Sequence, residues 1–366
     1  MTTVLDYLVW RGDLTFEQDP FNEVDNLILS ELCYFDFIDV IEKNESVSLE
    51  TVARRYFKRY PYGTHRLGLL LSSSFDDLLL LCAKSARFSQ VRLSFPVSIV
   101  KNKPATQFAA ITFELPNKTL YIGFRGTDDH IVAWKESLSL AVKDKIPAQK
   151  AALSYLKAIT QKRSEAFYVG GHSKGGNLAL YAALHLDAAE RHRILQIYNN
   201  DGPGFRHNVS ETEAHLALKD RIHAITPYLS VVGAMLEHGN TAEVIESYGK
   251  GILQHDALTW RVSGKAFVRL PSRSEESLKF ETAVKAWTEK LGEKDQTIFI
   301  ETLYRLLTSS GAKTLSDLGD DKIRSAYKAT ATLLTLNKPT RDLVANALIL
   351  FFRERKNALR NSKNNK

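Results

Sequence analysis

The sequence predicts an α/β fold in which helices cover both faces of a mostly parallel sheet. Between about residues 119 and 226, short β-branched and aromatic runs alternate with segments of helix length. Such alternation is typical of parallel strands joined by crossover helices. Within it, an apolar run leads into the glycine-rich stretch YVGGHSKGG, residues 168–176, and a helical pattern follows at once. Because glycine is costly in regular structure, we expect a tight strand–helix turn there.

Length, composition and cysteine content indicate an ordinary globular protein. The 366 residues can bury a large core, and 44% of them are hydrophobic and 25% charged. With 2 cysteines, no disulfide framework is predicted and a reducing compartment, the cytoplasm, is expected. The initial MTTVLDYLVWRGD does not match a secretory signal, and the apolar run 67–82 is interrupted by charges and too short for a membrane span.

The net charge of +7 is concentrated at the C-terminus. Residues 353–366 contain six Lys or Arg and one Glu, which leaves +2 for the other 352 residues. No nucleic-acid-binding motif accompanies this charge, so no nucleic-acid partner is expected. The tail is expected to be a solvated, frayed terminus. Peripheral membrane contact is the one association predicted for it.

Four segments are predicted along the chain. Residues 1–90 form an N-terminal helical segment packed on the core, residues 91–268 the core, residues 269–352 a C-terminal helical region, and residues 353–366 the basic tail. Within the first segment, apolar residues such as Leu27 and Leu81 supply the packing faces of helices between residues 23 and 83.

The core elements follow from period and turn residues. Three short strands separated by KNKP and LPNK turns come first, and helices and strands then alternate. The predicted elements are strands at 91–100, 108–114 and 119–124, helices near 131–142 and 148–161, a strand at 166–169, a helix at 175–186, and strands at 194–199 and 222–226.

From about residue 275 the pattern is helical only. Apolar residues at helical spacing predict one helix that stops at Gly292 and another that stops near Gly311. A last helix is predicted after Pro339, with Thr340 as its cap. These apolar stripes are interpreted as packed core.

The glycine-rich turn carries the first chemical prediction. Residues 171–175, GHSKG, fit the pattern G-x-S-x-G between a strand and a helix, which is the context of a nucleophile elbow. Ser173 would then be an exposed nucleophile, and the backbone N–H of Lys174 would face a developing oxyanion. The alternatives are a glycine-rich joint with an incidental serine and a phosphate loop, although the order Ser-Lys-Gly does not fit the latter.

Several motifs together resemble a known family. The strand end FRGT, residues 124–127, followed by a Trp-containing helix, is similar to the class 3 lipase branch of the α/β-hydrolases. With GHSKGGN (171–177), NDGPGF (200–205) and QHD (254–256), the chain resembles more closely an uncharacterised bacterial family of lipase-like proteins. The resemblance covers roughly residues 90–265. It implies that Thr127 lies in the oxyanion hole and that residues 128–134 take the place of a lid, or else start a helix capped by Asp128 or Asp129.

The remaining triad members must follow the nucleophile in the order acid, then histidine. His255 is the predicted base, because it lies between a late loop and a last strand-like run, with His238 in reserve. Ser230 stands where class 3 lipases usually carry the aspartate. Asp201 directly follows the preceding strand, after which some other lipases place their acid, and it is the predicted acid.

Two other carboxylates stay open as the acid. Glu237 is the reserve, and Asp256 ranks behind it because it adjoins His255.

These residues predict a serine hydrolase of lipase or esterase type that cleaves a carboxylic ester, lipid esters included, through Ser173, His255 and Asp201. Neither a metal nor an organic cofactor is expected. The alternative is a hydrolase-shaped scaffold with weak catalysis that binds a lipid or protein partner, because fold does not fix function. The sequence makes no prediction about the oligomeric state.

Overall fold

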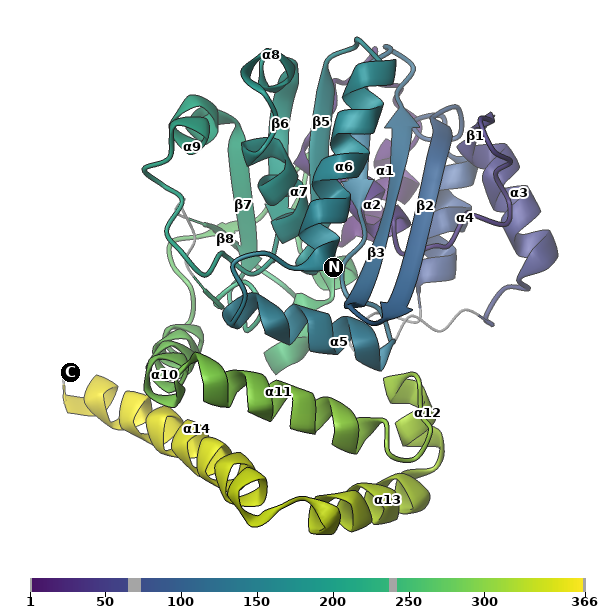
Figure 1. Cartoon of the computed structure of the whole chain (residues 1–366). Helices are drawn as coiled ribbons and strands as arrows, with labels where there is room; N and C mark the ends of the chain where they lie inside the picture. Colours follow the sequence, from purple (N-terminus) through teal and green to yellow (C-terminus); the bar gives the residue numbers. More distant parts are fainter. Residues whose placement is uncertain (1, 65–73, 237–241, 365–366) are drawn as a thin grey trace.

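The computed structural model of the chain describes residues 2–64, 74–236 and 242–364, with side chains up to residue 356 apart from residue 320. Within these residues, a nine-stranded sheet with the order β1-β2-β3-β4-β5-β6-β7-β8-β11 forms the centre (Figure 1). Neighbouring strands from β4 to β8 are parallel, whereas the pairs at both edges are antiparallel. The predicted α/β fold, with a mostly parallel sheet and flanking helices, is confirmed.

The elements have the following bounds. The strands are β1 (Ser46–Ser48), β2 (Arg92–Asn102), β3 (Ala105–Glu114), β4 (Leu120–Phe124), β5 (Phe167–His172), β6 (Ile194–Asn200), β7 (Ile222–Pro227), β8 (Glu243–Ile245) and β11 (Arg269–Leu270), with β9 (Val262–Ser263) and β10 (Ala266–Phe267) as a separate pair. The helices around the sheet are α1 (Val4–Arg11), α2 (Glu23–Leu32), α3 (Leu49–Arg59), α4 (Phe75–Lys84), α5 (Ile131–Leu138), α6 (Pro147–Lys162), α7 (Lys174–Leu184), α8 (Ala188–Arg191) and α9 (Glu213–Leu218).

Two apolar layers bury the sheet. Strand β4, LYIGF, is buried along its whole length, as expected of a strand with helices on both faces. On one face, Ile122 and Val169 pack against α6 and α7. On the other, Phe113 and Tyr121 pack against α2. Because successive side chains alternate between faces, neighbouring residues of one strand serve the two layers.

The register brings the strand ends together. Phe124 of β4 is the partner of Gly171 in β5, and His172 is the partner of Asn200 in β6. The loops after β4, β5 and β6 therefore meet at one edge of the sheet. This carboxyl edge is where ligands bind in open α/β sheets.

A buried ion pair anchors the N-terminal segment. Asp25 and Arg87 are both fully buried, with Oδ2 and Nη2 2.5 Å apart. Asp25 also accepts a hydrogen bond from the N–H of Asn22, which closes a capping box at the start of α2. Arg87 donates further to main-chain carbonyls, including that of Asp19 at 3.0 Å. Residues 20–32, PFNEVDNLILSEL, thus have an architectural role, because they join α2 to the segment after α4.

Five helices follow the core. They are α10 (Glu275–Leu291), α11 (Glu293–Leu307), α12 (Leu315–Asp320), α13 (Lys322–Thr335) and α14 (Lys338–Asn364). Helix α10 ends at Gly292, which has φ 69°. The prediction of Thr340 as a cap is wrong: α14 begins two residues earlier, and the Oδ1 of Asn337 accepts the N–H of Thr340 at 2.9 Å. Helix α14 also runs through residue 353, where the basic tail was expected to begin as a frayed terminus.

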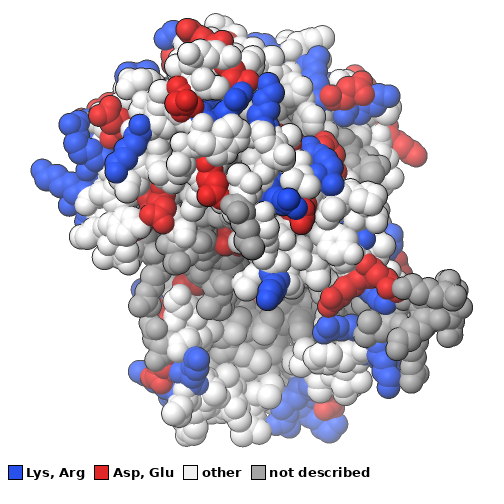
Figure 2. Space-filling view, turned by 180° about the vertical axis from the view of Figure 1, so that it is seen from behind, with Lys and Arg blue, Asp and Glu red and all other residues white. Residues whose placement is uncertain are grey.

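On the face shown in Figure 2, cationic and anionic side chains are interspersed over the core. In the part of the chain that the structure describes, no helix combines the length and apolarity needed to cross a bilayer.

We expect Arg87→Met to lower the free energy of unfolding by about 3–5 kcal/mol, because it leaves the Asp25 carboxylate buried without its cation. Urea denaturation measures this change. The control is Arg55→Met, which removes a partly exposed pair with Glu45 and should cost less than about 1 kcal/mol. Equal losses in the two variants would contradict the anchoring role.

Candidate active site

The turn between β5 and α7 presents Ser173. Its backbone has φ 57° and ψ −133°, and its N–H donates to the carbonyl of Asn200 at 2.9 Å. A Cβ at Gly171 would lie 2.5 Å from the carbonyl oxygen of Phe124, and a Cβ at Gly175 would lie closer still. Only glycine fits at these two positions, so the strand turns sharply into the helix with Ser173 at the carboxyl edge. This is the geometry of a nucleophile elbow.

Asp201 follows the end of β6 and contacts His255. Its Oδ2 lies 2.7 Å from Nδ1 of His255. Its Oδ1 accepts hydrogen bonds from the hydroxyls of Thr226 at 2.9 Å and Ser230 at 2.5 Å. All four side chains are buried. Because a carboxylate only accepts, this contact places the imidazole proton on Nδ1 and leaves Nε2 of His255 as an acceptor.

His172 attaches His255 to the elbow. Its Nε2 donates to the carbonyl of His255 at 2.9 Å, and the two rings lie 4.6 Å apart. His172 directly precedes Ser173, so the loop that carries His255 is held beside the nucleophile. Among the described residues, however, no hydrogen bond joins the Ser173 hydroxyl to His255.

A buried carboxyl lies behind His172. Glu31 Oε1 is 3.1 Å from Nδ1 of His172, and the hydroxyl of Tyr34 is 3.2 Å from the same nitrogen. Burial, and next the charge of Asp256, raise the pKa of Glu31 well above its usual value. Burial, and next the proximity of His255, lower the pKa of His172 well below its usual value. Both shifts favour the neutral form of the group, and His172 acts as a hydrogen-bonding support.

Two other carboxylates were candidates for the acid. Of these, Glu237 lies outside the described residues, as does His238, the reserve base. The carboxylate of Asp256 accepts from the N–H of Leu258 at 3.1 Å and caps the short helix η4 (Ala257–Thr259). Burial raises the pKa of Asp256 to about 6.

The turn after β4 lies against the elbow. A Cβ at Gly126 would be 3.1 Å from Cβ of Ser173. The hydroxyl of Thr127 lies 2.6 Å from the hydroxyl of Ser137 on α5. Within the described residues, the backbone N–H groups of Thr127 and Lys174 have no acceptor. Two unpaired donors thus come from the two turns that meet at Ser173, as an oxyanion hole requires.

The Lys174 side chain runs away from that turn into the core. Its Nζ donates to the carbonyl and the Oε1 of Gln107 at 2.7 and 2.6 Å, and it lies 3.0 Å from Oε2 of Glu136. Burial lowers the pKa of Lys174. Glu136 also accepts the N–H of Ala148 at 2.9 Å. This buried ion pair ties the elbow to α5, the helix that follows the Thr127 turn.

Residues 129–131, in the segment that was expected to take the place of a lid, are fastened to the C-terminal helices. One interpretation of the sequence, that Asp128 or Asp129 caps α5, is wrong. The N-cap residue of α5 is His130, and its side chain makes no cap hydrogen bond. Instead, the carbonyl of Asp129 accepts the N–H of Leu315 at 3.0 Å, and its Oδ2 accepts the N–H of Ser316 at 3.2 Å. The start of α12 therefore holds residues 129–131.

Sequence reasoning missed the polar face of α2. Asn26 Nδ2 donates to the side-chain oxygen of Asn200 at 3.0 Å, and Asn200 Nδ2 donates to the hydroxyl of Ser30 at 3.1 Å. With Glu31, these residues support the carboxyl ends of β5 and β6. The available signal was that Asn26, Ser30 and Glu31 flank the apolar run Leu27–Leu29 within the helix. Ser230 was also missed, because it was considered only as the absence of an aspartate.

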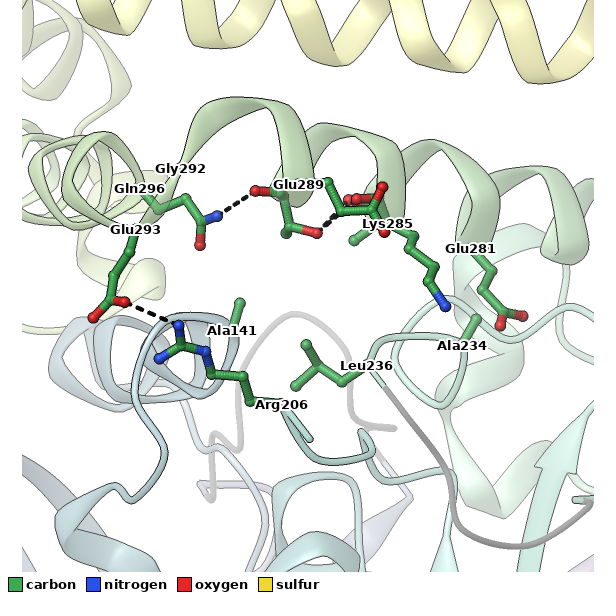
Figure 3. A pocket seen from close by; sticks show the side chains of 12 residues that line it. Ala141, Arg206, Ala234, Leu236, Glu281, Lys285, Glu289, Gly292, Glu293 and Gln296 are labelled. Carbon is green, nitrogen blue, oxygen red and sulfur yellow. Dashed lines mark hydrogen bonds and ion pairs between the residues drawn. The ribbon is translucent and has the colours of Figure 1, made fainter. Parts of the chain in front are cut away.

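A cavity of about 370 Å³ lies between α10 and the core (Figure 3). Ala234 and Leu236 line it from the loop after β7, and Lys285 and Glu289 line it from α10. The start of α10 also holds this loop, because the Ser277 hydroxyl donates to the carbonyl of Ser230 at 2.6 Å. The cavity therefore borders the loop that supports Asp201, and its lining is partly aliphatic and partly charged.

The sheet, the elbow and the turns at its carboxyl edge define a lipase-like α/β protein. A family model described as Mbeg1-like matches residues 82–305, and the chain belongs to this family. No curated protein matches the chain. A search of solved structures finds the crystal structure of M37 lipase, at 17% identity and a TM-score of 0.33, over 57% of this chain and 68% of that one.

We expect Asp256→Asn to stabilise the fold at pH 8 by up to about 3 kcal/mol, because each pKa unit corresponds to about 1.4 kcal/mol. The folded-state pKa of Asp256 is about 6, against the ordinary aspartate value of 3.8. The folded state therefore binds more protons between these values, and the wild type loses this stability as pH rises through that window. Asparagine keeps the cap, so urea denaturation of both proteins at pH 4 and pH 8 isolates the effect. A difference that does not grow with pH would contradict it.

Proposed function

We propose that this protein is a serine hydrolase of lipase or esterase type that cleaves carboxylic esters, lipid esters included. Ser173 is the nucleophile, His255 the base and Asp201 the acid. The observation that carries the proposal is the 2.7 Å contact between His255 Nδ1 and Asp201 Oδ2, made beside an elbow that presents a serine. Membership of a lipase-like family supports the same reaction class.

The reaction proceeds in two steps. Ser173 Oγ attacks the acyl carbon while His255 Nε2 takes its proton, and the amides of Thr127 and Lys174 stabilise the oxyanion. The alcohol leaves with the proton from His255, and water then repeats the sequence to release the acid. Asp201 holds the imidazole tautomer and stabilises the imidazolium. The hydrogen bond from Ser173 to His255 forms when substrate binds, because such contacts are often long in free enzymes.

A second function is a hydrolase-shaped scaffold that binds a lipid or protein partner with weak catalysis. Two observations favour it: within the described residues the Ser173 hydroxyl makes no hydrogen bond to His255, and residues 129–131 are attached to α12. p-Nitrophenyl esters of increasing chain length distinguish the two functions. A residual rate that His255→Ala leaves unchanged would favour the scaffold.

We also retain three broader assignments from the sequence. The two cysteines, Cys33 and Cys82, are free and buried, which supports the cytoplasm as the site of action. The motifs support a bacterial lipase-like family. Glu237 stays the reserve acid.

We expect Asp201→Asn to lower kcat for p-nitrophenyl esters by roughly a thousandfold, because the imidazole loses its orientation and its counter-charge. Asp256→Asn and Glu237→Gln should stay within about tenfold of the wild type, as neutral changes away from a triad do. Circular dichroism confirms that the variants fold. If Glu237→Gln is the crippled variant instead, Asp201 is not the acid.

Ser230→Ala should lower kcat by about tenfold to a hundredfold, since a hydrogen bond to a charged group is worth about 1.5–3 kcal/mol. KM should stay near wild type, and Ser230→Thr should restore most of the rate. The matched control is Ser247→Ala, which removes a hydroxyl that pairs with Thr259 away from Asp201. A decrease in kcat of the same size in Ser247→Ala would contradict the proposed role of Ser230.

A further inference from the structure

Helix α13 exposes an apolar stripe. Ile323, Tyr327 and Leu334 lie on one face of the helix by their spacing, and they are 87%, 69% and 66% exposed. No residue of α13 is buried. Large side chains in a contiguous exposed patch mark an interaction surface.

Helix α14 also carries exposed apolar side chains. Ile349 and Phe352 are 63% and 61% exposed. The opposite face of α14 packs on α10, where the indole N–H of Trp287 donates to the carbonyl of Ala347 at 2.8 Å. Helices α13 and α14, the outer helix pair, lie on the far side of α10 and α11 from the sheet (Figure 1).

The charge of the chain is concentrated on the same segment. Residues 322–366 contain 11 Lys and Arg and 2 Asp and Glu, which amounts to +9. The preceding 321 residues therefore carry −2 of the total +7. On α13, Lys322, Arg324 and Lys328 are exposed beside the apolar stripe, and none of them pairs with a described carboxylate.

We propose that the outer helix pair docks on an anionic lipid surface. The proposal rests on the proposed function, since it brings the enzyme to lipid esters. Amphipathic helices that combine apolar side chains with Lys and Arg bind the interface of anionic bilayers. A nucleic acid would use the cations but leave the apolar stripe in water. A symmetric second copy would place one +9 surface against another, which opposes association.

Docking in this way directs the candidate active site to the bilayer. Helix α10 holds the Ser230 loop at the end of β7, and α12 holds residues 129–131 after β4. The C-terminal helices therefore cover the carboxyl edge of the sheet, and the outer helix pair is the far surface of that cover. Helix α12 adjoins α13 in the chain and holds residues 129–131, so it connects the outer helix pair to this segment.

The test is flotation of the full chain with vesicles of phosphatidylcholine alone or mixed with phosphatidylglycerol. The Ser173→Ala variant is used, so that binding is measured without hydrolysis. We expect binding to the mixed vesicles and little to phosphatidylcholine alone. Arg324→Glu with Lys328→Glu should lower the partition constant about a hundredfold or more. Tyr327→Ser with Leu334→Ser should lower it at least about tenfold.

Matched controls keep charge and hydrophobicity constant. Arg54→Glu with Lys58→Glu makes the same charge change at the same spacing on α3, and Val9→Ser removes an apolar side chain that is 71% exposed on α1. These controls should bind like the parent protein, and all of the altered side chains are exposed, so folding is expected to survive.

Four outcomes overturn the proposal. They are no binding to mixed vesicles, equal losses in the controls, binding to a DNA duplex that displaces the vesicles, and a dimer in sedimentation that Tyr327→Ser with Leu334→Ser dissociates. Vesicle binding without ester hydrolysis by the wild type overturns only the proposed function. Hydrolysis of soluble esters without vesicle binding overturns only this inference.

Discussion

The close packing of β4, β5 and α7 at Gly171 and Gly175 is the constraint on which the candidate site depends. Without side chains at these positions, the end of β5 turns into α7 against the carbonyl of Phe124. The turn holds Ser173 at positive φ, with its N–H on Asn200. It also directs the first amides of α7 toward the turn at Thr127. A larger residue at either glycine would move the nucleophile and one oxyanion donor together.

Buried polar groups hold the surroundings of the elbow, and they come from distant parts of the chain. His172 joins the elbow to the backbone of His255, and α2 supplies Glu31 behind it. On the other side, Lys174 pairs with Glu136 of α5. An unpaired buried polar group is costly, so each of these contacts restricts where its element can lie. The N-terminal segment and α5 are thus parts of the site's support, although neither supplies the serine, the histidine or the acid.

The strand ends were predictable from the sequence, and the supporting contacts were not. The strand–turn–helix context at Ser173 and the chain order of the fold led to Asp201 and His255, because strand ends in a parallel sheet meet at one edge. The role of Ser230 depends on where the loop after β7 lies, and the periodicity of a sequence does not predict the position of a loop. The attachment of Asp129 to Ser316 joins residues far apart in sequence through backbone groups that every residue carries. The exposed stripe of α13 was not predicted, and helical spacing alone would not say whether a partner covers the face.

The central claim is that Ser173 is an activated nucleophile. Its most direct test is reaction of the folded wild type with a fluorophosphonate probe, followed by mass spectrometry of the modified peptide. The account predicts one phosphonyl group on Ser173, with labelling slowed strongly in Asp201→Asn and abolished in Ser173→Ala. A folded wild-type protein that stays unlabelled, or labelling that persists in Ser173→Ala, would contradict it.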